Sequence, residues 1–181
     1  GVKMDSLKLG LAHHRLVRVM PNTPAQIGEG ISVWTASGAV RESQKEAVRT
    51  VLSALGEELF VEDEKYLDMA TAVSGSGPAY VFLFIEALTD AAVHIGLPRA
   101  MAERLVLQTV IGSARFARVS GKHPAELRNM VTSPGGTTAE ALLRLERGKL
   151  RGAVAQAVIA AYEKARALGR EPRWAITKPF Y

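Results

Sequence analysis

The sequence is organised around the stretch Met130-Val131-Thr132-Ser133-Pro134-Gly135-Gly136-Thr137-Thr138-Ala139-Glu140. The proline and the two glycines exclude regular secondary structure at its centre. Helical spacing begins directly afterwards, because Leu142 and Leu145 stand three residues apart and share one helix face. The stretch therefore predicts a glycine-containing loop that leads into the N-terminus of a helix, expected over 138–147.

This predicted helix start has two interpretations. Thr137 and Glu140 have the spacing of a capping box, which predicts Thr137 as the N-cap and leaves the Thr138 hydroxyl free in the first helical residue. Alternatively, the free N–H groups and the helix dipole bind a carboxylate or phosphate, with the hydroxyl of Ser133 also nearby. A capped helix is enough to explain the spacing of Thr137 and Glu140. The second threonine is more than a cap needs, and it favours a binding site.

The first sixty residues have the pattern of an α/β sheet fragment. Alternating polar and apolar residues over 15–20 predict a strand, and the loop Met20-Pro21-Asn22-Thr23-Pro24 follows its C-terminal end. Ligands of open α/β sheets bind at that end. Further strands are predicted over 31–35 and 58–61, with an amphipathic helix over 42–55 between them. A fragment this small leaves sheet edges and faces uncovered, so it needs a partner.

From Asp63 onward the pattern is helical. The helix predicted over 78–95 is apolar nearly all round, so it must be covered on every side, and a second subunit is the expected cover. The small residues at 74–77 predict a loop before Pro78, either for tight packing or for a site. Other helices are predicted over 4–11, 64–73, 98–119, 123–131 and 151–168.

Composition narrows the function classes. The chain has 181 residues, 48% of them hydrophobic, no cysteine and a net charge of +5. The charges are scattered without an aromatic-basic stripe, so no nucleic-acid binding is expected. The apolar run over 79–85 is too short to span a bilayer, so no membrane association is expected. Glu86, Asp90 and His94 are spread over two helical turns, too far apart to share one metal ion, so no metal site is expected.

Four spaced motifs give the chain a resemblance to a known family. The 133–138 loop, preceded by Glu126-Leu127-Arg128-Asn129-Met130-Val131, resembles the signature of pyrroline-5-carboxylate reductase. Three further segments resemble the same family in the same order: Arg18-Val19-Met20-Pro21-Asn22-Thr23-Pro24, Ser74-Gly75-Ser76-Gly77-Pro78-Ala79-Tyr80 and Gly96-Leu97-Pro98-Arg99.

The resemblance implies a fold class and domain boundaries. The expected fold is mainly α: a C-terminal helical dimerisation domain preceded by the last strands of a Rossmann-type α/β domain. Residues 1–61 are expected to be the remnant of the dinucleotide-binding domain, residues 62–169 the helical dimerisation and substrate-binding domain, and residues 170–181 an extended tail. No G-x-G-x-x-G fingerprint occurs, because Tyr80 takes the third glycine position of 75–80. The chain is therefore expected to be a fragment that is inactive alone.

The resemblance also implies an activity, reduction of 1-pyrroline-5-carboxylate to L-proline with NADPH or NADH in the cytoplasm. It implies a homodimer through the helical domain, or a larger homo-oligomer. The alternative is a non-catalytic helical oligomerisation fragment. Thr138 is the expected catalytic residue, partner of the ring nitrogen. Substrate binding is expected from Ser133, Gly135, Gly136, Thr137, Thr138 and Glu64, and cofactor binding from Met20, Pro21, Asn22 and Thr23. Glu64 has a second interpretation, as an acid favoured by the dipole at a helix start.

Overall fold

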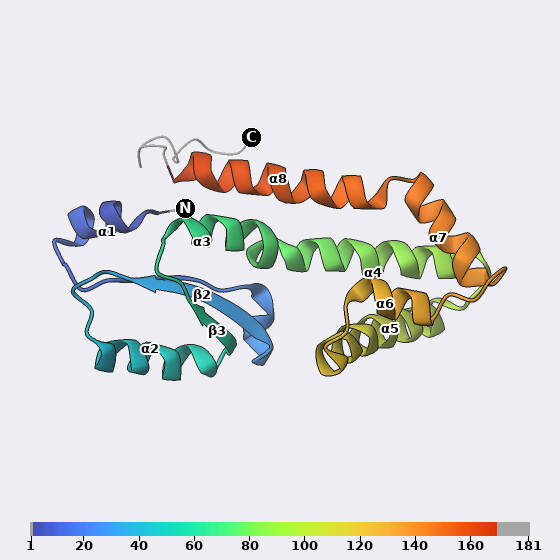
Figure 1. Ribbon diagram of the computed structural model, residues 1–181, viewed down its shortest axis with the longest axis horizontal. Coiled ribbons are helices and arrows are strands. Elements are labelled where there is room, and N and C mark those ends of the chain that lie inside the picture. Colours follow the sequence, from blue (N-terminus) through green and yellow to red (C-terminus); the bar gives the residue numbers. More distant parts are fainter. Residues whose placement is uncertain (1, 170–181) are drawn as a thin grey trace. The chain divides into compact units, whose positions relative to one another are not determined.

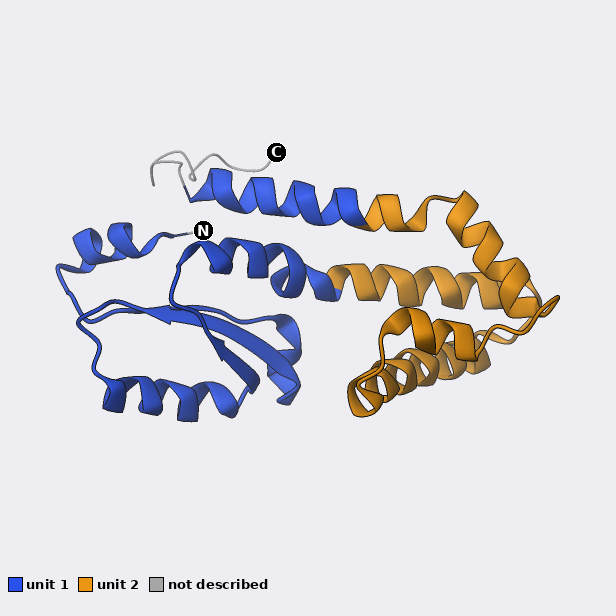
Figure 2. Cartoon of the chain, viewed as in Figure 1, with its two compact units in different colours: residues 1–78, 155–181 blue, residues 79–154 orange. Residues whose placement is uncertain are grey.

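The computed structural model describes residues 2–169, so the predicted extended tail at 170–181 lies outside the described residues. The chain forms two compact units (Figure 2). Unit 1 comprises residues 1–78 and 155–181, and unit 2 comprises residues 79–154. The mainly helical fold with a small sheet is confirmed. The domain boundary at residue 61 stays a prediction, because the two compact units divide after residue 78 and again after residue 154.

Unit 1 contains a three-stranded sheet of order β1-β2-β3. Strand β1 (Val17–Met20) runs antiparallel to β2 (Gly30–Ala36), and β2 runs parallel to β3 (Gly56–Phe60). Helix α2 (Glu42–Ser53) makes the crossover between the parallel strands, and a 3₁₀ turn, η1 (Thr23–Ile27), follows β1. The three strands and α2 confirm the sequence-based prediction, whereas the 3₁₀ turn was not predicted.

The two faces of the sheet carry different helices (Figure 1). Val17 and Val19 line an apolar groove together with side chains of α2. On the same face Trp34 is fully buried and meets Phe60 edge to face, with ring centroids 4.8 Å apart. Helix α3 (Lys65–Ala70) contacts β1 and β2, and its Leu67 is fully buried. Because side chains alternate along a strand, Arg18 and Met20 belong to the α3 face.

Helix α3, a π-helical turn η2 (Thr71–Gly75) and helix α4 (Gly77–His94) follow one another as a single helical stretch. The loop predicted at 74–77 is therefore wrong. The Ser76 amide donates to the Thr71 carbonyl at 2.8 Å, five residues back, and the Ser74 hydroxyl donates to the Ala70 carbonyl at 2.9 Å. Pro78 has no N–H to donate to residue 74, and a wider turn before it lets the helix continue.

This helical stretch, Lys65–His94, is 30 residues long. By length and composition alone it could cross a membrane, and only 11% of its most apolar 18-residue segment is buried. A core helix of a soluble protein meets the same criterion. The stretch is longer than the separate helices predicted at 64–73 and 78–95 because the expected interruption is absent.

Unit 2 contains most of α4, then α5 (Arg99–Ser120), α6 (Pro124–Met130), α7 (Thr137–Arg147) and the first turn of α8 (Leu150–Leu168). The rest of α8 and the short α1 (Met4–Leu11) belong to unit 1. The buried residues of unit 2 are few: Thr89, Ala102 and Val106. Many of its large apolar side chains are exposed instead, including those of Phe82, Leu83 and Phe116.

Candidate functional site

The N-terminus of α7 differs from the predicted capping box. Gly136 is the N-cap, with φ −79° and ψ 166°, and no side chain bonds to the cap. The prediction that Thr137 is the N-cap is therefore wrong: Thr137 and Thr138 are the first and second helical residues. The left-handed φ of Gly135, +68°, turns the chain one residue earlier than expected. Glu140 pairs with Arg144 instead, at 3.3 Å.

This helix start has hydrogen-bonding capacity to spare. Within residues 2–169, no hydrogen bond is made by the amides of Thr137, Thr138 and Ala139, whereas the Glu140 amide donates to the Gly136 carbonyl at 3.3 Å. Thr138 is half-buried, and Ser133 and Thr137 are exposed. A Cβ on Gly136 would clash with the Ser133 hydroxyl, so the glycine leaves room for that hydroxyl next to the N-cap position. Unpaired amides at the positive end of a helix dipole fit a carboxylate.

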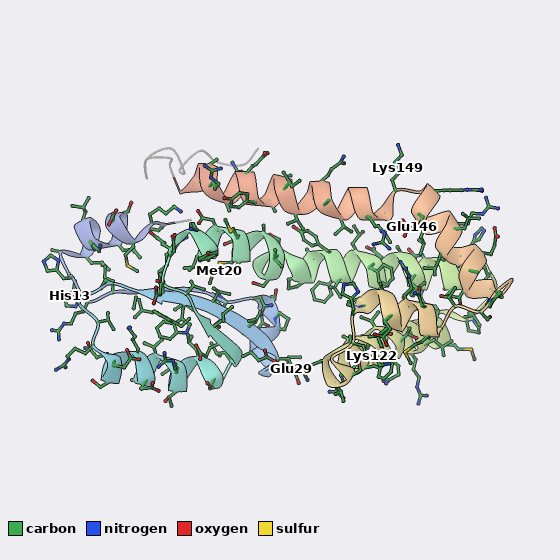
Figure 3. The ribbon with its side chains drawn as sticks, in the orientation of Figure 1. His13, Met20, Glu29, Lys122, Glu146 and Lys149 are labelled. Carbon is green, nitrogen blue, oxygen red and sulfur yellow. The ribbon has the colours of Figure 1, made fainter. Side chains whose placement is uncertain are left out.

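The loop over residues 20–23 leaves the C-terminal end of β1, as predicted. Pro21 and Thr23 are exposed, and Met20 and Asn22 are half-buried. The Asn22 side-chain carbonyl accepts the Ile31 amide at 2.9 Å, which ties the loop to the start of β2. The side chain of Met20, which is labelled in Figure 3, lies between the sheet and the π-helical turn η2. The loop is thus held by the sheet at both ends, with two side chains free at its tip.

Glu64 immediately precedes α3 and is engaged within unit 1. Its Oε1 atom accepts the Met4 amide at 2.7 Å and Nη1 of Arg18 at 2.7 Å. Nη2 of Arg18 donates to Asp68 at 3.2 Å, and Lys3 also pairs with Asp68. The network joins β1, α3 and the start of α1. Its role for Glu64 is structural, and a role facing the substrate stays a prediction.

The other members of this network were not predicted from the sequence, although the sequence contains a signal for them. Arg18 is a charged residue in an otherwise apolar strand, and its side chain is only 11% exposed. Glu64 and Asp68 stand four residues apart, so a helix presents both on one face. Asp68 is 4% exposed and needs a partner, since a buried charge is paired in native proteins.

An exposed ion pair, Asp63 with Lys65, flanks Glu64 in the sequence. The Lys65 ammonium, 2.8 Å from Asp63, lowers the pKa of that carboxyl through their side-chain hydrogen bond. The same bond raises the pKa of Lys65. Both side chains are exposed, so the pair resembles an ordinary surface ion pair.

The candidate residues fall into two groups. Met20, Pro21, Asn22, Thr23 and Glu64 belong to unit 1, and the loop 133–138 belongs to unit 2. Asp90, one of the three residues considered for a metal ion, pairs with Arg99 at 3.0 Å. Across residues 2–169 no cluster of three His, Cys, Asp or Glu side chains has the geometry of a metal site.

The arrangement of sheet and helices has known counterparts. The crystal structure of Plasmodium falciparum pyrroline carboxylate reductase with NADP bound superimposes with a TM-score of 0.88 at 39% sequence identity, covering 93% of this chain and 68% of that one. The Coxiella burnetii pyrroline-5-carboxylate reductase also gives a TM-score of 0.88, at 40% identity, covering 94% of this chain and 64% of that one. The fold is that of the carboxy-terminal part of such reductases.

The sequence comparisons agree. The family model "Pyrroline-5-carboxylate reductase dimerisation" matches residues 64–168. The pyrroline-5-carboxylate reductase of Pisum sativum is 45% identical over 168 residues, which cover 93% of this chain and 61% of the relative. The chain belongs to the pyrroline-5-carboxylate reductase family, and it spans less than two thirds of the length of this relative.

Proposed function

We propose that the chain is the carboxy-terminal part of a cytoplasmic enzyme that reduces 1-pyrroline-5-carboxylate to L-proline. Family membership supports the activity. The observation that carries the assignment to this chain's own residues is the N-terminus of α7, which no side chain caps and whose second residue, Thr138, is half-buried. A cyclic imine acid needs a site for its carboxylate and a hydrogen-bond partner for its ring nitrogen, and this helix start offers both.

The substrate carboxylate would bind at the start of α7. The free amides of Thr137, Thr138 and Ala139 converge there, and the carboxylate would complete the cap that the sequence does not supply. The Ser133 hydroxyl adds a donor at the edge of the loop. Gly135 and Gly136 shape the loop around the anion, the first by its left-handed φ and the second by leaving space. Charge-assisted bonds of this kind also fix the orientation of the ring.

Thr138 is the proposed catalytic residue. As the second residue of α7, Thr138 does not use its hydroxyl as a helix cap. The hydroxyl can therefore form a hydrogen bond with the ring nitrogen and keep the proton of this nitrogen in place, and the proton remains on the nitrogen in the product. Glu64 is the second candidate for the nitrogen. Since its Oε1 already accepts two bonds, only the remaining oxygen would be free for that role.

The cofactor supplies a hydride to the imine carbon when it is bound. The residues of this chain fit its nicotinamide end: the 20–23 loop lies at the C-terminal end of β1, with Pro21 and Thr23 exposed. The pyrophosphate has no G-x-G-x-x-G loop in this sequence. NADPH is the proposed cofactor, with NADH as the alternative, and the pyrophosphate would bind to a dinucleotide-binding half supplied from elsewhere in the polypeptide.

A homodimer is the proposed assembly, with a larger homo-oligomer as its extension. The apolar side chains that unit 2 exposes support it, as does the dimerisation model that matches 64–168. The same exposure favours the alternative function, a non-catalytic oligomerisation fragment, for the 181-residue chain in isolation.

The test compares two proteins: the 181-residue chain, and a completed reductase in which an N-terminal dinucleotide-binding half from the Pisum sativum relative precedes it. We expect the completed reductase to oxidise NADPH when 1-pyrroline-5-carboxylate is added, and the 181-residue chain to bind no NADPH in a titration. A completed reductase that folds, binds NADPH and does not turn the substrate over would contradict the proposed function. NADPH binding by the 181-residue chain would contradict the proposed division of the site.

A further inference from the structure

We infer that Gly75 is a positioning residue for the cofactor loop, because its missing side chain makes the space in which the methyl group of Met20 lies. The inference rests on the proposed function, since Met20 begins the loop that would contact the nicotinamide. It links the π-helical turn η2 to the end of β1, two features that the proposed mechanism does not otherwise connect.

Alternation along β1 brings Met20 to η2. Val17 and Val19 face α2, so Arg18 and Met20 face the opposite helix. Arg18 confirms this by its bonds to Glu64 and Asp68, which precede and belong to α3. Met20 lies two residues further along the strand and therefore reaches the next part of the same helix, the π turn.

The π turn places Gly75 against that methionine. A Cβ built on Gly75 would lie 2.5 Å from Cε of Met20, and the next nearest atoms, in Thr71 and Ala70, would be 3.7 and 3.9 Å away. The last two separations are ordinary contacts. The Met20 methyl group is therefore what a side chain at position 75 would displace.

The backbone gives no other reason for glycine at this position. Gly75 is not among the glycines with a positive φ, so an L-residue could adopt its conformation. Glycine inside a helix is less favourable than alanine. The space for Met20 offsets that cost. π-helical turns occur frequently at functional sites, where they re-aim one part of a helix.

Gly77 provides a matched control two residues away. It starts α4, and a Cβ built on it would meet no atom within 4 Å. Gly77→Ala therefore adds the same methyl group to the same stretch of helix without touching Met20. Met20→Leu supplies the complementary change, because leucine keeps an apolar side chain but ends one atom short of Cε.

The first experiment tests the contact without any activity. The 181-residue chain is labelled with ¹³C at its methionine methyl groups, and the Met20 signal is assigned from Met20→Leu. Gly75→Ala should move the Met20 signal, whereas Gly77→Ala should leave it in place. An unchanged Met20 signal in a folded Gly75→Ala chain would overturn the inference, whatever the enzyme does.

The second experiment tests positioning in the completed reductase. Because the end of a methionine side chain is flexible, Gly75→Ala should fold normally, yet raise KM for NADPH about fivefold or more with a smaller change in kcat. In the Met20→Leu background the same substitution should change KM less than about twofold, since coupled residues are not additive. Gly77→Ala should resemble wild type.

An unchanged KM in Gly75→Ala, or an equal rise in both backgrounds, would overturn the inference. A wild-type protein without turnover would count against the proposed function instead, leaving the NMR result intact.

Discussion

Unit 1 closes a core of its own, whereas unit 2 does not. In unit 1, Trp34 and Leu67 are fully buried on opposite faces of one sheet, and Arg18 joins two acids beneath α3. In unit 2, Phe82 is 60% exposed and Leu83 is 66% exposed, although both belong to a long apolar helix. Large exposed apolar side chains gathered on one helix favour an interaction site. From this difference we infer that the sheet is stabilised within the chain, whereas the helices of unit 2 would be completed by the proposed second copy.

The same contrast extends to polar groups. The Arg18 network of unit 1 is satisfied internally, since Glu64 and Asp68 accept all the described bonds of the Arg18 guanidinium. Unit 2 leaves the amides at the start of α7 unused within residues 2–169. The Arg18 network is closed within unit 1, whereas the amides at the start of α7 are available to the substrate carboxylate that we propose. Removing the Arg18 side chain in unit 1 should therefore lower stability. Removing a proposed ligand-binding group at the start of α7 in unit 2 should lower activity.

The largest expected effect concerns the buried network of unit 1. Arg18→Ala removes the guanidinium that pairs with Glu64 and Asp68 and leaves Lys3 as the remaining partner of Asp68, so it should lower the free energy of unfolding by about 3 kcal/mol, near the lower end for a broken buried pair. Urea unfolding of the 181-residue chain measures it. Arg144→Ala is the control, since Arg144 pairs with Glu140 on an exposed face of unit 2 and should lose at most about 1 kcal/mol. Equal losses in the two variants would remove the contrast between the units.

Thr138→Ala should act on turnover rather than on folding. Loss of a hydrogen bond to a charged group is worth about 1.5–3 kcal/mol, so kcat/KM of the completed reductase should fall roughly tenfold to a hundredfold. Thr138→Ser keeps the hydroxyl and should retain most of the activity. Steady-state kinetics beside thermal melts measures both. A Thr138→Ala enzyme with the wild-type rate would show that the hydroxyl has no catalytic role.

Thr137→Ala should have little effect on stability. A capping threonine would lose about 1 kcal/mol on this change. Because Gly136 is the N-cap and no side chain bonds to it, we expect the Thr137→Ala chain to stay within about 0.5 kcal/mol of wild type. Chemical unfolding decides between the two values, and a loss near the larger one would restore Thr137 as the cap.

The smallest expected effect is a pH dependence of the exposed charges on α2. A side-chain hydrogen bond from Lys45, followed by one from Arg49, lowers the pKa of Glu42 in the folded chain. A lowered acid pKa stabilises the fold above the unfolded value of 4.5, and this contribution is lost as the pH falls through the folded value. In melts from pH 7 down to pH 3, Glu42→Gln should therefore reduce the acid-induced fall in Tm slightly. A larger fall in the variant would have the wrong sign.

Regular patterning made much of the fold predictable. The three strands, α2 and α5–α8 follow from alternation, helical spacing and the glycines between them. Two predictions were wrong because short-range rules allowed two outcomes. Gly136 and Thr137 both suit an N-cap, and the left-handed φ of Gly135 decides between them. Small residues at 74–77 suit either a loop or a π turn, and the packing of Met20 against Gly75 is consistent with the second.

The candidate site was predictable only in part. The 133–138 loop could be found because its residues are adjacent in sequence. The Arg18 network could not be paired in advance, since Arg18 and Glu64 are 46 residues apart and Lys3 and Asp68 are 65 apart. Such partners are set by how β1 and α3 pack. The sequence could indicate only that each charge needed a partner.

The central claim, that unit 2 is completed by a second copy, is tested most directly by the mass of the 181-residue chain in solution. Multi-angle light scattering at micromolar concentration should give at least twice the 19.5 kDa of one chain. Leu83→Asp, which places a charge on the exposed apolar face of α4, should shift the mass to that of one chain. A wild-type chain that is folded and has the mass of one chain under these conditions would contradict the claim.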